Sequence, residues 1–501
     1  MAAAPAPDAE WVTDANESFH LSLVRPKEDK ACLTAREVYE GFNPTFTYPV
    51  RVAHPPPNDP VLNRAVSPAQ IFGEDEKFYG YKDLVVDLKF ASGSLAQYVK
   101  ISYADKLPSS SAVDNIEDTL AQFIPPGYYK SEAEFTKRVE EDATTFKPYG
   151  TLIHSYSRSA RKMSSGRKNA SLPQPVYNPN DDEIVEFEVY HAKWDTPGFR
   201  EYHRRMQIFI LLYIEGGSYI EEGEDAWEFV VLYEKRRRRS SPDVVTYHFV
   251  GYSTLYPFYC FPEKTRMRLS QFVILPPYQQ EGHGSALYAS IYQYIVSEPT
   301  IAELTVEDPA EPFEDLRDRN DLKMLLNNER FMREALGDDF TNSGRASPAH
   351  HPSPLLNGNG HNGHGGGGGG GGRVARSRTT HHERSVPLGS NGHGGAGASA
   401  RRKTLGKMGP PVDRKWMEKW RVELKIAQRQ FNRLIEMLIL KHMNHADGPA
   451  FKQYRLQVKQ RLYRFNYEIL MQLDLEERQK KLDETFQGVK KDYDRILQTV
   501  H

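Results

Sequence analysis

The sequence predicts an α/β (α+β) chain that ends in a helical region, and three observations predict it. The 501 residues allow about three domains of ordinary size. Strand-like and helix-like segments alternate before residue 336, and apolar residues recur at three- and four-residue spacing after residue 411. We therefore predict a mixed α/β N-terminal domain at 1–150, a second α/β domain at 151–335, a linker at 336–411 and a helical C-terminal domain at 412–501.

The composition excludes several classes of protein. Cys32 and Cys260 are the two cysteines, which argues against a disulfide-built scaffold and a cysteine-rich zinc module. No apolar run approaches the length of a membrane-spanning helix, and Met1–Glu10 lacks the pattern of a signal peptide. We therefore expect a soluble protein of a reducing compartment.

The formal net charge of −2 conceals an uneven distribution. Residues 1–335 carry 37 Lys and Arg against 51 Asp and Glu, whereas residues 401–501 carry 23 against 13. An acidic body favours cationic partners and argues against nucleic-acid binding by that part of the chain.

Several short elements are predicted before residue 260. Ser131 and Glu134 form a capping box that opens a short helix. A basic, serine-containing hairpin tip is expected at 236–243. The expected strands are 79–92, 98–103, 184–189, 209–214, 227–233 and 244–256.

The stretch from 268 to 308 reads as strand, loop, helix and strand. Pro276-Pro277 ends the first strand, Leu269–Leu275, because proline cannot donate to a strand ladder. A helix of about 12 residues at 285–296 spans roughly 18 Å, which matches the length of a returning strand. The strand Ile301–Val306 therefore lies parallel to the first after a right-handed crossover. This connection places Glu307 near the Gly282–Gly284 loop.

The Gly282–Gly284 loop suits an anion. Glycine allows close approach of a ligand to the backbone, and the free N–H groups at a helix start bind phosphate. A Gly-x-Gly pair alone is more often a packing turn than a binding loop. The loop matches neither a Walker loop nor the dinucleotide fingerprint, because Leu287 stands where the latter needs glycine.

The linker at 336–411 is predicted to be disordered, because eight consecutive glycines at Gly365–Gly372 leave little apolar surface to bury. Its histidines lack a fixed ligand spacing, so no metal site is predicted. After it, apolar stripes predict helices at 416–438 and 451–469 and a third at about 476–497. A small bundle is the favoured interpretation, and a partner-binding helix is the alternative.

The pattern Gln279–Gly284 resembles the acetyl-CoA signature of the GNAT acetyltransferase superfamily. The surrounding segments are similar to the type B histone acetyltransferase catalytic subunits over roughly residues 10–335. The segments that carry this resemblance are 72–76, 80–82, 250–258, 271–279, 282–285, 304–309 and 315–318. The resemblance implies a GNAT fold for 151–335 and transfer of acetyl from acetyl-CoA to lysines in the N-terminal tail of newly synthesised, free core histone four. It also implies a WD-repeat histone chaperone partner and a location in cytoplasm and nucleus, with no metal, membrane or direct nucleic-acid binding.

The resemblance also implies a role for individual residues. Glu307 would be the general base, assisted by Glu215 and Asp308. The cofactor-binding residues would be Phe272, Val273 and Ile274 along the pantetheine arm and Gln279, Gln280, Glu281, Gly282, His283, Gly284 and Ser285 around the pyrophosphate. The histone tail would contact Glu74, Asp75, Glu76, Trp227, Tyr256, Pro257 and Phe258.

Three alternatives remain open. Cys260 would be the nucleophile of an acyl-cysteine relay if a base such as His248 activated it. The chain would otherwise be a GNAT enzyme acting on another protein or amine, or a non-catalytic histone-binding scaffold. Acidic clusters around Trp227 and over 303–321 favour a lysine-rich partner, although such runs are commonly solvated faces.

Overall fold

The computed structural model describes residues 9–46 apart from Arg36, 76–108, 113–159, 184–306 apart from 239, 240 and 242, 308–337 and 406–500. The predicted disordered linker lies mostly outside these residues. So do three predicted site residues, Glu74, Asp75 and Glu307.

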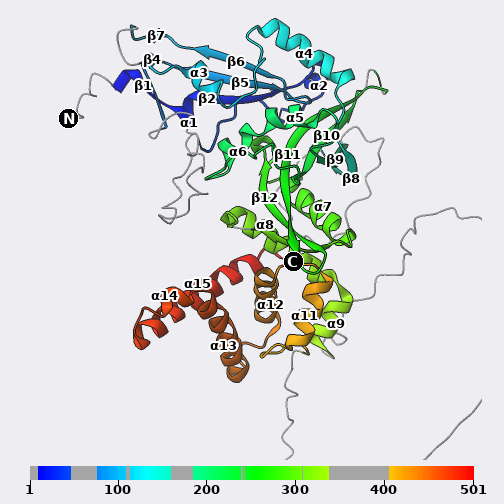
Figure 1. Cartoon of the computed structure of the whole chain (residues 1–501), viewed down its shortest axis with the longest axis vertical. Coiled ribbons are helices and arrows are strands. Elements are labelled where there is room, and N and C mark those ends of the chain that lie inside the picture. Colours follow the sequence, from blue (N-terminus) through cyan, green and yellow to red (C-terminus); the bar gives the residue numbers. More distant parts are fainter. Residues whose placement is uncertain are drawn as a thin grey trace, which may run out of the picture.

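A six-stranded sheet forms the centre of the molecule (Figure 1). Its strand order is β13-β12-β11-β10-β9-β8, and every neighbouring pair is antiparallel except the parallel pair β12 and β13. The strands are β8 (Thr151–Ser159), β9 (Ile184–Lys193), β10 (Glu228–Arg237), β11 (Val245–Cys260), β12 (Lys264–Ile274) and β13 (Ile301–Val306). The crossover between the parallel strands β12 and β13 is helix α7 (His283–Ser297), preceded by the 3-10 turn η3 (Pro276–Tyr278).

A smaller three-stranded sheet lies at the N-terminal end of the molecule, where β5 is parallel to β2 and antiparallel to β6. Two-stranded sheets pair β1 with β3 and β4 with β7. These elements are η1 (Ala9–Trp11), β1 (Val12–Asp14), α1 (Ala15–Ser18), β2 (Phe19–Val24), α2 (Lys27–Ala31), β3 (Lys77–Tyr79), β4 (Tyr81–Lys82), β5 (Val85–Ala91), β6 (Gln97–Ser102), β7 (Asp105–Lys106), α3 (Ile116–Leu120) and α4 (Glu132–Thr145). One hydrophobic core joins this sheet to the central one and spans the predicted boundary at residue 150.

Helices α5 (Phe199–Met206) and α6 (Ile208–Tyr213) connect β9 to β10 in the sequence and lie between the two sheets in space (Figure 1). After β13 the chain forms α8 (Glu311–Asn327) and α9 (Glu329–Leu336). The C-terminal region consists of α11 (Arg414–Glu423), α12 (Gln428–His442), α13 (Gly448–Phe465), α14 (Tyr467–Leu470) and α15 (Leu475–Leu497). In the part of the chain that is described, no helix is both long enough and apolar enough to cross a bilayer.

The C-terminal helices do not pack as a separate bundle. Their apolar side chains share one core with α8 and α9, which includes Leu322, Phe331 and Phe431. The segment between α11 and α12 also reaches the central sheet, because the N–H of Leu304 in β13 donates to the carbonyl of Lys425 at 2.9 Å. The helical region is therefore built onto the second α/β unit.

The predicted fold class is confirmed: the chain is mixed α/β with C-terminal helices. The strands at 269–275 and 301–306, their parallel pairing and the hairpin at 236–243 are confirmed by β12, β13 and the β10–β11 connection. The capping box is confirmed as well, since the Ser131 side chain accepts a hydrogen bond from the N–H of Glu134.

Three predicted elements differ from the structure. The strand predicted at 209–214 is helix α6, because a short, wholly apolar run has no periodicity to separate the two states. The strand predicted at 79–92 is three strands, since Gly80 and Asp83 have positive φ and break it. The helix predicted at 416–438 is interrupted at Lys425, which has a φ of 51°.

Candidate active site

A cavity of about 1350 Å³ opens beside the carboxyl ends of β12 and β13. Its walls come from these strands, the start of α7, one side of α8, the segment after α6 and the last residues of the chain. The residues that line it are Thr45, Phe46, Tyr213, Ile214, Glu215, Gly216, Leu269, Ser270, Phe272, Val273, Ile274, Gln279, Gln280, Gly282, Gly284, Ser285, Val306, Asp308, Pro309, Ala310, Glu311, Pro312, Phe313, Leu316, Arg319, Asn320, Lys323 and Thr499.

Strands β12 and β13 part at this cavity. Their parallel register ends at Leu269 and Val306, whereas β12 continues to Ile274. Ser270 is an extra residue in the ladder with β11, and such a bulge bends a strand away from its course. Among the described strands none pairs with β12 beyond Leu269 on the β13 side. On the cavity side, no described strand pairs with the backbone of Phe272–Ile274, although the carbonyl of Ile274 accepts a hydrogen bond from Gln279 Nε2 at 2.8 Å. This edge suits a ligand that carries amides.

The loop before α7 gives the cavity an anion-binding end. Gln280 and Gly282 have φ values of 61° and 84°, which turn the chain sharply into the helix. Gly282 is the N-cap, and no side-chain hydrogen bond caps the helix there. Since the first N–H groups of a helix lack intrahelical partners, the start of α7 attracts negative charge.

Helix α8 adds cations that the sequence analysis missed. Arg319 and Lys323 both line the cavity, four residues apart on one side of the helix. Between them, Asn320 donates to the Ser285 hydroxyl at 3.1 Å and ties α8 to the start of α7. The four-residue spacing of Arg319 and Lys323 could have indicated that they share one side of a helix. The sequence analysis predicted no helix at 311–327, so it could not use this spacing.

Two of the three predicted catalytic carboxylates line the cavity. Glu215 follows α6 and Asp308 follows β13, and both are exposed. Asp308 has a φ of 44°, so the chain turns abruptly directly after the strand. Glu307 lies outside the described residues, while both its neighbours, Val306 and Asp308, line the cavity.

Eight of the ten predicted cofactor-binding residues line the cavity, whereas Glu281 and His283 are not among the residues that line it. The His283 side chain is only 2% exposed, and its Nδ1 lies 2.8 Å from the Tyr156 hydroxyl. Burial lowers the pKa of His283 to about 4, so the ring stays neutral near pH 7. This side chain anchors the start of α7, and a ligand would meet only the backbone of His283.

Among the described residues, the predicted tail-binding residues lie outside the cavity lining. Trp227 and Tyr256 make an edge-on ring contact at 4.8 Å, and Tyr256 packs on Phe258 at 4.9 Å. Tyr256 pairs with Arg268, directly before the cavity residue Leu269. These aromatic residues lie on the sheet beyond the cavity. Their predicted role in binding a histone tail stays a prediction, as does that of Pro257 and Glu76.

Many acidic side chains of the two clusters, around Trp227 and over 303–321, form ion pairs with basic side chains of the same chain. Glu228 is buried, and although burial opposes its charge, His191, Lys193 and Tyr294 hold its pKa at about 2. Other acids of the two clusters are paired likewise: Glu222 with Arg204, Asp225 with Arg200, Glu303 with Arg266 and Arg421, Asp315 with Arg495, and Asp318 with Arg433. The expected acidic surface for a lysine-rich partner is therefore much smaller than the sequence indicates.

The structure separates Cys260 from His248, the base that an acyl-cysteine relay would need. Cys260 and His248 are twelve residues apart on the single strand β11, which places them about 40 Å from each other. His248 is 1% exposed, and its Nδ1 lies 2.8 Å from the Ser92 hydroxyl instead. Cys260 is not among the residues that line the cavity.

Two family models match this chain. "Histone acetyl transferase HAT1 N-terminus" matches residues 66–215, and "Fungal HAT1, C-terminal" matches residues 403–444. A histone acetyltransferase type B catalytic subunit of Cryptococcus neoformans is 44% identical over 492 residues, which cover 97% of each chain. The chain belongs to this family of histone acetyltransferase type B catalytic subunits.

Two further members of the family match a smaller part of the chain. The Mycosarcoma maydis subunit is 38% identical and covers 90% of this chain and 82% of its own length. The Homo sapiens subunit is 32% identical over 335 residues, 66% of this chain and 68% of its own. Among solved structures, an aminoglycoside acetyltransferase from a soil metagenome matches at 14% identity with a TM-score of 0.18, over 34% of this chain and 97% of that one. The chain is thus an acetyltransferase, and the assignment rests on the sequence relatives.

Proposed function

We propose that the chain transfers acetyl from acetyl-CoA directly to the ε-amine of lysines in a histone tail, namely the N-terminal tail of newly synthesised, free core histone four. The relatives at 44% and 38% identity are named histone acetyltransferases. The observation that carries the proposal is that one cavity combines an unpaired strand edge, a helix start without a side-chain cap and two exposed carboxylates.

The cavity fits acetyl-CoA, which would supply the acetyl thioester. The backbone of Phe272–Ile274 suits the amide groups of a pantetheine arm, because both partners can pair as neighbouring strands do. The start of α7 suits the pyrophosphate, with Arg319 and Lys323 adding positive charge from α8. We keep the predicted roles of Gln279–Ser285 in this proposal, except for the side chains of Glu281 and His283, which are not among the residues that line the cavity.

The carboxylates would prepare the acceptor amine. A lysine with a pKa of about 10.4 is mostly protonated near neutral pH and must lose a proton before it attacks. We assign that step to Glu307 as general base, directly or through water, with Glu215 and Asp308 assisting from the cavity wall. The amine nitrogen then bonds to the acetyl carbon, and the N–H of Ile274 would stabilise the developing charge on oxygen. The carbon–sulfur bond breaks, the nitrogen gives up its second proton, and the coenzyme leaves as a thiolate that takes up a proton.

The other end of the cavity suits the acceptor side chain. Phe46, Tyr213 and Ile214 line it beside Glu215, and apolar walls match the aliphatic stem of lysine while a carboxylate faces its amine. We extend the proposal to tail contacts by Trp227, Tyr256–Phe258 and Glu74–Glu76, to a WD-repeat chaperone partner and to a location in cytoplasm and nucleus.

Mass spectrometry of a mixture of free histones after incubation with the chain and acetyl-CoA tests the proposal. We expect acetylation of lysines in the N-terminal tail of histone four. Glu307→Gln should lower the rate at saturating acetyl-CoA near neutral pH by about 100-fold or more. The control Glu484→Gln, on an exposed part of α15, should leave it unchanged.

Other outcomes select the alternatives. Acetylation of a different protein or amine, with histones untouched, would show a GNAT enzyme of other specificity. Binding of acetyl-CoA without any transfer would show a scaffold. Loss of activity in a folded Cys260→Ala variant would restore the acyl-cysteine relay.

A further inference from the structure

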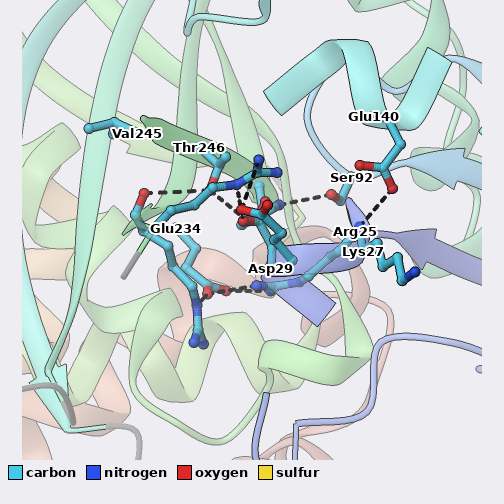
Figure 2. A network of polar contacts seen from close by, with 12 residues as sticks. Arg25, Lys27, Asp29, Ser92, Glu140, Glu234, Val245 and Thr246 are labelled. Atoms are coloured by element: carbon cyan, nitrogen blue, oxygen red, sulfur yellow. Dashed lines mark hydrogen bonds and ion pairs between the residues drawn. The ribbon is translucent and has the colours of Figure 1, made fainter. Parts of the chain in front are cut away.

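A buried ion pair lies directly beneath the loop that precedes α7. Arg25, which follows β2, donates from both terminal nitrogens to Glu234 of β10 at 2.9 and 2.6 Å. The two residues are 3% and 1% exposed. Figure 2 shows Arg25 and Glu234 facing each other within a larger polar network between the N-terminal elements and the central sheet.

Tyr278 is the third member of this cluster. Arg25 Nη2 donates to the Tyr278 hydroxyl at 2.8 Å, and that hydroxyl donates to Glu234 Oε2 at 2.8 Å. The Arg25 guanidinium also lies 3.9 Å above the Tyr39 ring, which packs 5.0 Å from the Tyr278 ring. Burial raises the pKa of Tyr278 well above its ordinary value, so its O–H stays available as a donor.

Further ion pairs extend the cluster among residues that do not line the cavity. Arg236 pairs with Glu234 and Glu37, and Asp29 pairs with Arg238. Through Arg236, Glu234 of β10 is thus also linked to Glu37 in the segment after α2. A buried ion pair adds little net stability compared with apolar packing. A role in positioning the loop before α7 therefore explains the Arg25–Glu234 pair better than a contribution to stability.

Tyr278 is directly followed by the cavity residues Gln279 and Gln280. Other contacts also hold the loop: Gln279 Nε2 donates to the carbonyl of Ile274 at 2.8 Å, the N–H of Gln279 donates to the carbonyl of Pro276 at 3.1 Å, and Arg158 donates to the carbonyl of Gly282 at 3.1 Å. The strained φ of 61° at Gln280 needs such support from its surroundings.

We propose that Tyr278 is a positioning residue that ties the coenzyme-binding loop 279–282 to the buried Arg25–Glu234 pair, so that the N-terminal elements set the place of the loop. This inference rests on the proposed function, because it takes acetyl-CoA as the ligand of the loop. Tyr278 itself is 2% exposed and does not line the cavity.

Tyr278→Phe removes the hydroxyl and keeps the ring. Calorimetric titration with acetyl-CoA should show a dissociation constant raised about tenfold, which equals roughly 1.4 kcal/mol. The KM for acetyl-CoA should rise in parallel, while kcat and the KM for a histone-tail peptide stay within about twofold. Hydrogen exchange of the peptide 276–285 should become faster.

The chain offers a matched control in its C-terminal helices. The Tyr493 hydroxyl donates to Glu436 Oε2 at 2.8 Å and accepts from Arg461 Nη2 at 3.0 Å, and Arg461 pairs with Glu436 through two nitrogens. Tyr493→Phe therefore removes the same hydroxyl from the same kind of cluster. It should lower thermal stability to a similar extent and leave the dissociation constant of acetyl-CoA unchanged.

The outcomes separate this inference from the proposed function. An unchanged dissociation constant in a folded Tyr278→Phe variant would show a structural role alone and overturn the inference. Binding of acetyl-CoA by the wild type without histone acetylation would refute the histone proposal, while the comparison of the two variants still decides the role of Tyr278. A wild type that does not bind acetyl-CoA refutes both. If Tyr278→Phe does not fold, Arg25→Lys, which keeps the charge and loses the two-pronged contact, should weaken acetyl-CoA binding, and an unchanged affinity there contradicts the inference.

Discussion

Buried carboxyl groups in this chain take opposite charge states, according to their partners. Burial opposes the charge of Glu234, but Arg25 and Arg236 hold its pKa well below the ordinary value. Burial raises the pKa of Asp321 to about 7, because hydrogen bonds from Gln430 and Tyr288 compensate only part of the lost hydration. A cationic partner keeps the first acid charged, and neutral partners leave the second poised to titrate near neutral pH.

Asp321 should make the stability of the chain fall as pH rises. Its folded pKa of about 7 exceeds the ordinary 3.8, so between these values the folded state holds a proton that the unfolded state releases. The resulting stability is present at low pH and is lost as pH rises through about 7, by at most ~1.4 kcal/mol per pH unit. Asp321→Asn should flatten this slope in urea denaturation across this range. The exposed control Asp105→Asn should retain it, and an equally steep slope in both would contradict the assignment.

At the scale of elements, the edge strand β13 explains why the cavity exists. β13 has six residues and pairs with β12 only as far as Leu269. The end of β12 is therefore left without a partner strand on that side. On the far side of β13, Ile426 forms a bridge to Leu304, which covers the opposite edge. The C-terminal region thus covers the outer edge of β13, while the edge of β12 beyond Leu269 faces the cavity.

Lys425 connects the same C-terminal segment to the end of α7. Its ammonium donates to the carbonyls of Ile295, Val296 and Glu298 at 2.9, 3.1 and 2.6 Å. Lysine at this position satisfies the last carbonyls of the helix and matches its negative end.

Lys425→Met should lower the free energy of unfolding by about 1–2 kcal/mol, measured by urea denaturation. The acetyl-CoA dissociation constant should stay within about twofold, because the start of α7 is held separately by His283 and Tyr156. Lys480→Met, at an exposed site on α15, serves as the control and should change neither quantity. Equal stability of the two variants would contradict a capping role.

For the whole molecule, acidic side chains of residues 1–335 form ion pairs with basic side chains of residues 401–501. The acids of α8 face the arginines of α12 and α15: Asp318 pairs with Arg433 at 2.7 Å, and Asp315 pairs with Arg495. The basic C-terminal region therefore neutralises the helix that forms one wall of the cavity. Thr499, beyond α15, reaches that cavity itself.

The two arginines should differ sharply in their effect on stability. Arg433→Met leaves Asp318, whose side chain is 0% exposed, without its cation, so we expect a loss of about 3–5 kcal/mol. Arg495 is 47% exposed, and Arg495→Met should cost below about 1 kcal/mol because water replaces the ion pair. Urea denaturation of both variants measures the difference, and similar losses would show that burial is not the deciding factor.

The local pattern of the site follows from the sequence alone. Pro276-Pro277 ends a strand, glycines open a helix, and the lengths of helix and strand return β13 beside β12. These spacings by themselves bring the Gly282–Gly284 loop to the edge of the sheet where β13 ends, whereas the roles expected of 272–274, 279–285 and 308 come from the family resemblance. Such features depend on neighbours in the chain, where backbone sterics and spacing act directly.

Which charges remain free, and what completes the cavity, depends on tertiary packing. Arg319, Lys323, Phe46 and Thr499 are spread along the sequence and meet only in the folded chain. The acidic clusters look free in the sequence because their arginines lie up to 180 residues away, as for Asp315 and Arg495. Burial and pairing over such separations depend on the folded arrangement of helices and sheet, which no local pattern of residues specifies.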